Sequence, residues 1–269
     1  MVQDSAANVM FISHGGGPLP LLGDPGHDEM VNVIEHMRQY RGVPDAIVIV
    51  SAHWESGPIA VTASESPSLL YDYYGFAQQA YEIDYSCPGS PALADDIVRR
   101  LSEQGITSQK EYTRGLDHGV FVPMALLFPE ANIPCVQVSL SASLSPAEHL
   151  QLGNALQFLK SQNVLLVGSG FTFHNMPAFF NSSHDRNAKA QSFLDWLLNV
   201  SDDKSISQQQ REHLLADWER SDNARFNHPR EEHLLPYLVC VAAAGKPISL
   251  QWRHRILGVP CASVAWRQD

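Results

Sequence analysis

The 269-residue sequence has no apolar run long enough to span a bilayer and no stretch rich in lysine or arginine. A membrane helix needs about 20 mostly apolar residues, and a nucleic-acid-binding surface needs clustered positive charge. The chain instead has 29 acidic against 18 basic side chains, a formal net charge of -11. Its first residues lack the features of a secretory signal. We therefore expect a soluble, cytoplasmic protein with neither membrane nor nucleic acid as a partner.

Cysteine is scarce, and the motifs of several common enzyme classes are missing. The four cysteines lie far apart, and none forms the C-x-x-C pair of zinc knuckles and thiol redox sites. The triple glycine at 15–17 lacks the lysine and the spacing of a phosphate-binding loop. No G-x-S-x-G sequence exposes a nucleophilic serine. These absences disfavour nucleotide-binding proteins and serine hydrolases, and they predict reduced, buried cysteines.

Six short segments rich in β-branched residues have the length and pattern of buried strands. They are Val9 to Ser13, Ala46 to Ser51, Pro134 to Leu140, Val164 to Gly168, Ile248 to Arg253 and Cys261 to Trp266. Expected helices separate most of them: Asp28 to Tyr40, Pro91 to near Gly105, one opened by a capping box at Ser145 to Glu148, Asn187 to Val200 and Gln208 to Trp218. The alternation predicts a single α/β domain, residues 1–269, with a central mixed or mostly parallel sheet covered by helices.

The segment from Tyr71 to Pro91 fits neither a helical nor a strand period. It contains five tyrosines and ends in two prolines separated by glycine and serine. Long irregular loops of this kind often form the wall or lid of a functional site.

Histidine is the abundant reactive side chain, with 12 in the sequence. His14 directly follows the first expected strand, and His53 lies two residues beyond the second. In open α/β sheets, ligands bind at the carboxyl ends of strands. A single histidine at such a place is more often a hydrogen-bonded structural residue. The repeated placement favours one metal ion bound by both.

Two more histidines follow the same pattern. His174 lies in the glycine-rich segment after the strand that ends at Gly168, and His118 follows Asp117 in a further loop. The Asp117 carboxylate or a nearby backbone carbonyl could fix the tautomer of the His118 ring.

A third ligand is expected near the start of an apolar segment that runs to Ala244. Pro229 suits a first helical position, so we expect a buried helix from there, kinked at Pro236. Glu232 and His233 then lie in its first turns, where a buried charge needs a partner. Adjacent helical residues point about 100° apart, so only one of the two faces a given metal. Two histidines and one further ligand suit Fe(II) in an oxygenase, and three histidines with water also suit zinc.

Several blocks of sequence resemble the class III extradiol ring-cleavage dioxygenases, and within them the 4,5-DOPA dioxygenase branch. The blocks, in the order of that family, are FISHGGGP, SAHWE, YDYYGF, LDHGVFVP, GSG with HN, and HPREEH, from near residue 11 to near residue 240. The resemblance implies an α/β fold and a mononuclear non-haem metal, Fe(II) for catalysis with Zn(II) possible in the purified protein. It also implies that O2 cleaves a catecholic, DOPA-like substrate beside its hydroxyl groups, giving a muconic semialdehyde.

The resemblance also implies roles for individual histidines. His14 and His53 match two metal ligands, and His233 stands where protocatechuate-type relatives have a glutamate ligand, with Glu232 as the reserve candidate. His174 matches the catalytic acid/base and is a possible fourth ligand. The remaining matched residue, His118, corresponds to a histidine near the oxygen site.

Substrate contacts are expected from aromatic and basic residues near these blocks. Tyr73 and Tyr74 are candidates for packing on the substrate ring, although tyrosines in loops are as often structural. His228 is a candidate helix cap or substrate contact. Arg225 and Arg230 lie close in sequence and could pair with an anionic catechol.

Two other functions fit the same residues. One is a zinc-dependent hydrolase in which His174 acts as general base on a metal-bound water. The other is a homologue that binds a metal or a small molecule without catalysis. The sequence predicts no oligomeric state.

Overall fold

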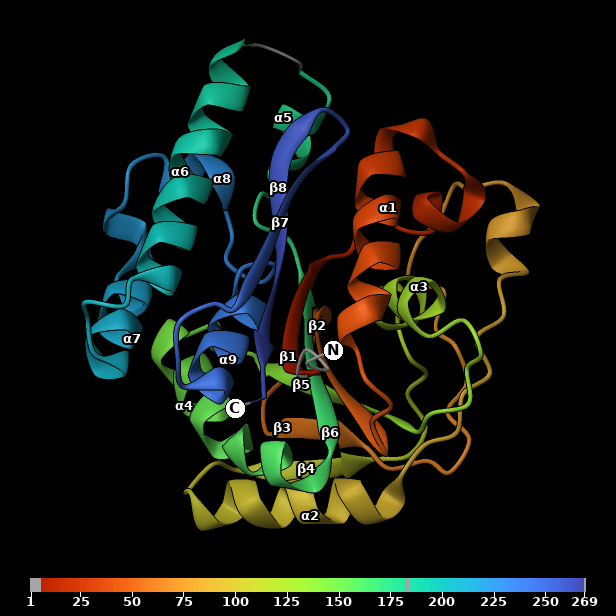
Figure 1. Cartoon of the computed structure of the whole chain (residues 1–269). Helices are drawn as coiled ribbons and strands as arrows, with labels where there is room; N and C mark the ends of the chain where they lie inside the picture. The colour runs from red at the N-terminus through yellow and green to blue at the C-terminus, as the bar shows by residue number, and fades with distance from the viewer. Residues whose placement is uncertain (1–5, 182–183, 269) are drawn as a thin grey trace, which may run out of the picture.

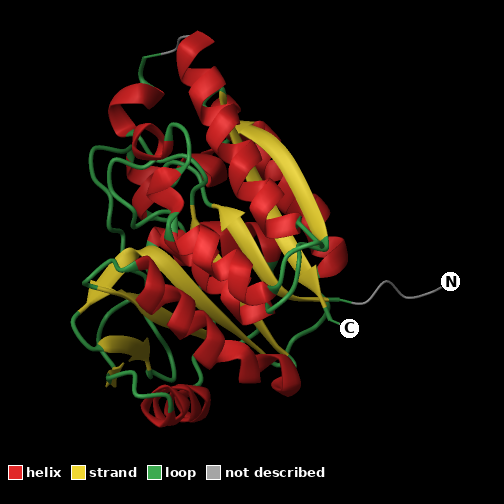
Figure 2. Ribbon diagram, turned by 90° about the vertical axis from the view of Figure 1, so that its left-hand side faces the viewer, coloured by secondary structure: helices red, strands yellow, loops and turns green. Residues whose placement is uncertain are grey.

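The computed structural model describes residues 6–181 and 184–268, in which eight strands form one mixed sheet with helices on both sides (Figures 1 and 2). The sheet order is β4-β3-β5-β2-β6-β1-β8-β7. The strands are β1 (Ala7–Ser13), β2 (Ala46–Ser56), β3 (Ile59–Thr62), β4 (Ser108–Glu111), β5 (Cys135–Ser141), β6 (Val164–Gly170), β7 (Leu250–Ile256) and β8 (Val259–Arg267). The predicted single-domain α/β fold is confirmed.

The four central strands run parallel. β2 pairs in parallel with β5 and β6, and β1 pairs in parallel with β6. Antiparallel pairs lie outside them, between β3 and β5, β1 and β8, and β7 and β8. The carboxyl ends of β1, β2 and β6 therefore meet at one edge of the sheet. Two short strands, β3 and β4, were not predicted, because each has only four residues and β4 is polar.

The helices of the described segments are α1 (Asp28–Met37), α2 (Pro91–Glu103), α3 (His118–Leu127), α4 (Pro146–Ala155), α5 (Met176–Phe179), α6 (His184–Asp202), α7 (Gln208–Ala216), α8 (Ala224–Asn227) and α9 (Leu235–Ala244). None of them is long and apolar enough to cross a membrane. The Tyr71 to Pro91 segment is irregular apart from one short 3-10 turn, as predicted.

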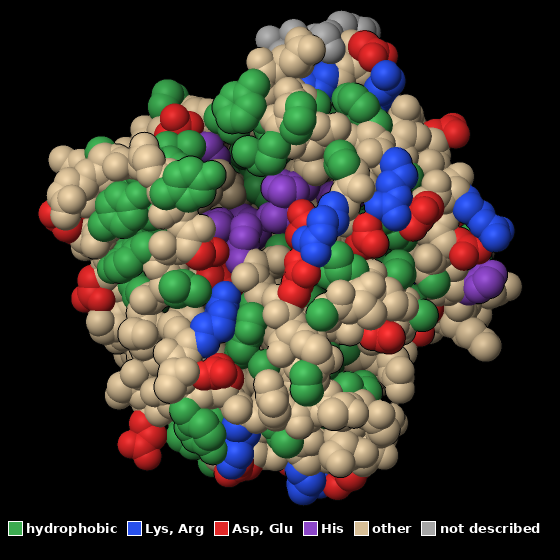
Figure 3. Space-filling view, turned by 180° about the vertical axis from the view of Figure 1, so that it is seen from behind, with side chains coloured by type: hydrophobic (Ala, Val, Ile, Leu, Met, Phe, Trp, Pro, Cys, Tyr) green, Lys and Arg blue, Asp and Glu red, His purple; other side chains and the backbone are tan. Residues whose placement is uncertain are grey.

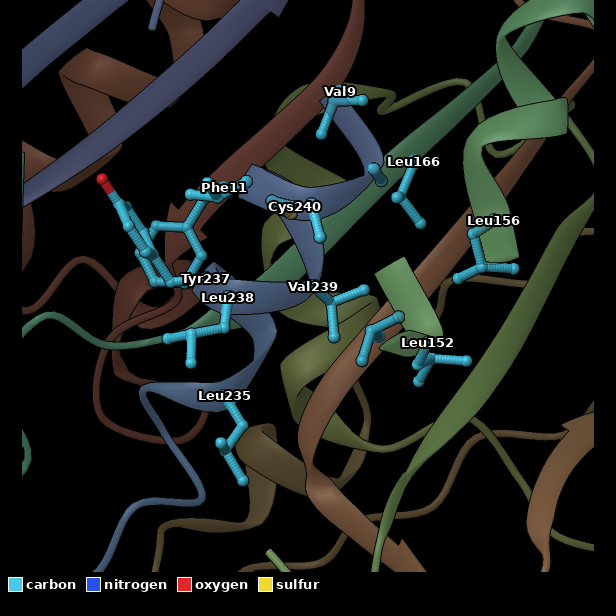
Figure 4. Packing of buried hydrophobic residues seen from close by; sticks show 14 of the residues in the cluster. Val9, Phe11, Leu152, Leu156, Leu166, Leu235, Tyr237, Leu238, Val239 and Cys240 are labelled. Atoms are coloured by element: carbon cyan, nitrogen blue, oxygen red, sulfur yellow. The ribbon is translucent and has the colours of Figure 1, made fainter. Parts of the chain in front are cut away.

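Two hydrophobic clusters fill the space between the sheet and its helices. Side chains of a strand alternate between its faces, so Phe11 of β1 packs toward α9 while Met10 and Ile12 pack toward α1 and α3. Figure 4 shows the α9 side, where the rings of Phe11 and Tyr237 meet edge to face with centroids 5.0 Å apart. The four cysteines are free and buried, as predicted.

The buried helix α9 begins later than the sequence pattern predicts. It starts at Leu235 instead of Pro229, and residues 229–234 form bends and a turn. Pro236 consequently lies in the first turn of the helix, where a missing N–H costs no hydrogen bond. The predicted kink at Pro236 was therefore wrong, and Glu232 and His233 precede the helix.

The predicted capping box of α4 is only half formed. The Ser145 hydroxyl accepts the backbone N–H of Glu148. The Glu148 carboxylate does not return to Ser145 but accepts the hydroxyls of Ser141 and Ser143 at 2.7 and 2.6 Å. The side chain thus ties α4 to the loop after β5.

Candidate metal centre

Three histidines meet at the carboxyl edge of the central strands. His14 follows β1, and its backbone N–H donates to the carbonyl of Gly170 at the end of β6. β2 extends to Ser56, so His53 lies within this strand, past Ser51, where pairing with β6 stops. The ring of His233 lies 5.4 Å from that of His14 and 4.9 Å from that of His53, between centroids.

The spacing of these rings fits one metal ion. One ring nitrogen of each of His14, His53 and His233 lies within 4.8 Å of the others. The Nε2 atoms of His14 and His53 are 3.0 Å apart. Two imidazole nitrogens that bind one ion at about 2.0–2.1 Å, at an angle near 90°, have about this separation.

The three imidazoles are held neutral, which is the form that binds a metal. Burial lowers the pKa of His14 and of His233 well below the usual value, and repulsion from neighbouring histidines lowers it further. Burial and the nearby His118 lower the pKa of His53 to about 4. At neutral pH each ring therefore has one nitrogen with a free lone pair.

A hydrogen-bond chain fixes which nitrogen of His14 is free. The Ser169 hydroxyl donates to the backbone carbonyl of Gly119, so its oxygen accepts from His14 Nδ1 at 2.9 Å. The proton of His14 is therefore on Nδ1, and the lone pair of Nε2 points toward His53. Metal-bound histidines are commonly oriented by such a second hydrogen bond.

Glu232 provides the equivalent hydrogen bond for His233 and also for His174. Its Oε1 lies 2.8 Å from Nδ1 of His233 and 3.1 Å from Nδ1 of His174. The rings of these two histidines stack, with centroids 3.4 Å apart. Burial favours the neutral acid, but the hydrogen bonds from both imidazoles outweigh it and hold the pKa of Glu232 well below its usual range. Glu232 is thus an ionised acceptor beside the three-histidine cluster.

Close backbone contact places His233 against the end of β6. The His233 carbonyl accepts the N–H of Phe171 at 2.9 Å. Gly170 leaves room for this contact, because an added Cβ would overlap the same carbonyl oxygen. The turn before α9 therefore contacts the end of β6, the strand that pairs with β1.

His118 and Asp72 lie beside His53. His118 opens α3, and its ring lies 4.0 Å from that of His53 between centroids. The Asp72 carboxylate accepts from both Nδ1 and the backbone N–H of His118, at 2.7 and 3.0 Å. Its other oxygen lies 3.8 Å from Nδ1 of His53. Burial would raise the pKa of Asp72, but the bonds from His118 leave it below the usual value.

Asp72 was missed in the sequence, where Asp117 was the expected partner of His118. Asp117 points elsewhere and accepts from Ser51, Arg114 and Gln137 at 2.7, 3.0 and 2.5 Å. The irregular loop that carries Asp72 was recognised, but nothing in its composition indicated which residue reaches a histidine.

We expect Asp72→Asn to lower the activity of the site by about 10- to 100-fold, the usual cost of losing an outer hydrogen-bond acceptor at a metal site. An amide cannot accept equally from both His118 groups and adds no negative charge beside His53. The matched control is Asp84→Asn, an exposed position in the same loop. Equal catalytic rates for the two variants would contradict a positioning role for Asp72.

The triple-glycine loop after His14 is held by a second histidine that the sequence did not single out. The N–H of Gly16 donates to Nε2 of the buried His27, whose Nδ1 donates to Asp24 at 2.7 Å. Gly15 has φ 84°, and an added Cβ would collide with Pro20 and His27. The loop can therefore lie close to the three-histidine cluster and form one wall of the site.

The five clustered histidines line a cavity of about 360 Å³. Its other walls are the glycine loop, Tyr73 and a set of apolar side chains: Leu19, Phe76, Phe171, Met176, Phe179, Phe180, Ile256 and Leu257. Figure 3 shows histidine side chains within a hollow on this face, with hydrophobic side chains near its rim. The volume is in the range of about 300–1,000 Å³ that is typical of small-molecule sites.

The predicted substrate contacts are only partly brought to this cavity. Tyr73 lines it, with its hydroxyl donating to the carbonyl of Ala80. Tyr74 is 92% exposed and lies outside the lining. His228 is fully buried and bonds to the carbonyl of Thr172 at 3.2 Å. Tyr74 and His228 therefore lie outside the cavity, and His228 is instead the C-cap residue of α8.

The two predicted arginine contacts are also engaged elsewhere. Arg230 donates to both carboxylate oxygens of Glu55, at 2.6 Å each. Arg225 pairs with Glu219 and Glu231 at 2.6 and 2.7 Å. Neither arginine lines the cavity.

Neutral imidazoles that converge at the carboxyl ends of the central parallel strands, in the lining of a cavity, fit the metal centre of an enzyme that acts on a small molecule. The chain belongs to the LigB family, described as the catalytic LigB subunit of aromatic ring-opening dioxygenase, which it matches over residues 9–262. The predicted membership of the class III extradiol dioxygenases is thereby confirmed, and the protein is an oxygenase of this ring-cleaving, metal-dependent family with O2 and a small molecule as its substrates.

Individual relatives support the same assignment. The chain is 37% identical to "Dioxygenase tasH" of Hapsidospora irregularis, covering 97% of this chain and 85% of that protein. It is 33% identical to the 4,5-DOPA dioxygenase extradiol of Beta vulgaris, covering 94% and 92%. The crystal structure of an uncharacterized protein, JW3007, from Escherichia coli K12 superimposes with a TM-score of 0.75 at 28% identity, covering 96% and 98%.

Proposed function

We propose that the protein is an extradiol catechol dioxygenase that cleaves the ring beside the hydroxyl groups and forms a muconic semialdehyde. The observation that carries the proposal is the convergence of one nitrogen each from His14, His53 and His233. Three protein ligands leave positions open for substrate and O2. Proteins named 4,5-DOPA dioxygenase extradiol are among the relatives. The four free, buried cysteines also fit a reducing cytoplasmic location, which we propose.

Fe(II) is the proposed cofactor. When bound, it would acidify the catechol hydroxyls and supply the redox chemistry that O2 requires. Zn(II) has no redox chemistry, although it can bind the same imidazoles. The Glu232 carboxylate already accepts two imidazole N–H groups, so we assign it a positioning role and assign His233 as the third ligand.

His174 is the proposed acid/base. Its Nδ1 is occupied by Glu232, so Nε2 is the nitrogen available to substrate in the cavity. It would take a proton from a catechol hydroxyl and later return it, while the Glu232 carboxylate stabilises the imidazolium. We keep His174 outside the metal ligand set for this reason.

His118 and Tyr73 complete the proposed site. Asp72 occupies Nδ1 of His118, which leaves Nε2 to hydrogen-bond dioxygen. The Tyr73 ring lies 5.8 Å from the ring of His118 between centroids and forms a wall for the substrate ring. The Tyr73 hydroxyl donates to the Ala80 carbonyl, so Tyr73 would contact the substrate with the face of its aromatic ring.

The test is to load the metal-free protein anaerobically with Fe(II) and add a panel of catechols with O2. We expect oxygen uptake equal to substrate consumed and a yellow ring-opened product. Zn(II)-loaded protein should show neither. Hydrolysis of esters or amides by the zinc form, with no oxygen uptake by the iron form, would instead establish a zinc hydrolase. Binding of the metal with no turnover of either kind would establish a non-catalytic homologue.

A further inference from the structure

The cavity walls beyond the histidines are almost entirely apolar. The apolar part of the lining includes Leu19, Phe76, Met176, Phe180, Ile256 and Leu257. A catechol placed with its hydroxyls at the histidines directs its ring substituent toward these side chains. We infer, on the basis of the function proposed above, that the natural substrate carries an uncharged, apolar substituent and is not an amino-acid catechol.

Within the described part of the chain, no charged side chain lines this cavity. Among residues 6–181 and 184–268, no lysine, arginine, aspartate or glutamate contributes to the lining. Arg230 and Arg225 are paired with glutamates, as described above. Arg186, behind Phe179, is buried and donates to the carbonyls of Ala178 and Phe179. An ionised substituent would lose its water without gaining a partner, which is strongly unfavourable.

Two carboxylates beside the cavity's histidines would repel an anionic substituent. Asp72 and Glu232, the two carboxylates that orient the histidines, both lie just behind the cavity wall. The amino acid DOPA carries a carboxylate. The cavity walls can therefore accommodate its ring, but binding of its charged side chain is unfavourable. This separates the chain from relatives whose names specify DOPA.

The apolar surface continues from the cavity to the exterior. Met176 is 50% exposed and Phe180 is 81% exposed, yet both line the cavity. A substituent longer than the cavity can therefore keep apolar contact as it reaches the mouth. Each buried methylene strengthens binding roughly fourfold.

The experiment measures binding and turnover separately. Zinc-loaded protein, which does not consume substrate, is titrated by calorimetry with catechol, 4-methylcatechol, 4-propylcatechol, 3-(3,4-dihydroxyphenyl)propionate and dopamine. The last two place a carboxylate or an ammonium where 4-propylcatechol has a methyl group. We expect Kd to fall from catechol to 4-propylcatechol and to be at least tenfold higher for either charged analogue. The iron-loaded protein should show the same order in kcat/KM.

A pair of variants tests the cause of this preference. Met176→Arg places a cation at the half-exposed rim, and Met176→Gln changes size and polarity without charge. We expect Met176→Arg to bring the Kd of the propionate at least fivefold closer to that of 4-propylcatechol, and Met176→Gln not to do so. Equal or tighter binding of the propionate or dopamine to the unaltered protein would overturn the inference. If the apolar analogues bind best but none is cleaved, the proposed dioxygenase function fails and the binding preference stands.

Discussion

Replacing His233 by alanine should reduce the metal content of the protein from one equivalent to background and abolish oxygen uptake. His233 supplies one of three converging nitrogens, and two imidazoles alone leave most of the coordination shell of the ion to water. The ring is buried and lies against the rings of His53, His14 and His174. Metal analysis after dialysis against a weak chelator measures the loss.

The comparison variant is Glu232→Gln, which removes the charge that orients His233 but leaves the ligand. We expect it to keep the metal with an affinity about 10- to 100-fold lower, as for other outer-sphere partners. His213→Ala, at an exposed position on α7, controls for loss of a histidine as such and should keep a full equivalent. Retention of metal by His233→Ala together with its loss from Glu232→Gln would move the third ligand to Glu232.

Replacing His174 by alanine should lower kcat by about 10²- to 10⁴-fold while the protein keeps one equivalent of metal. Its proposed work is proton transfer at Nε2, and its Nδ1 is committed to Glu232. Removing the ring opens space at the cavity wall, so added imidazole should restore part of the rate. Oxygen uptake is measured with and without imidazole, and metal content on the same samples.

The alternative role of His174 gives a different result. If His174 is a fourth ligand, His174→Ala loses metal together with activity, and imidazole restores both. If its role is only to pack against His233, the rate changes little. Only a large loss of rate with metal retained agrees with the proposed acid/base.

The sequence was most informative where a residue's place follows from strand order. His14 and His53 were matched because each follows an apolar run expected to be a buried strand, and in the sheet their strands, β1 and β2, both pair in parallel with β6. The third histidine, His233, was placed near the start of the buried helix, but the helix boundary was set too early. Proline at 229 and at 236 each suits a first turn, and sequence alone does not choose between them.

Long-range side-chain contacts were beyond the reach of the sequence. Asp72 meets His118, 46 residues away, through a loop with no regular period. The burial of His228 and the pairing of Arg230 with Glu55, 175 residues away, depend equally on the packed fold. Each of these contacts forms only when separate elements are brought together. The local composition of a segment does not indicate which distant side chain it will contact.

The tie between His233 and the end of β6 has a consequence for folding as well as for chemistry. His14 and His233 are more than 200 residues apart in the chain, and an ion held by both would act as a cross-link between the first strand and the last helix. Such a cross-link closes a very long loop of the chain, and the ion binds only the folded state. Metal supply would then set how long the domain persists against unfolding and proteolysis, in addition to setting its rate of turnover.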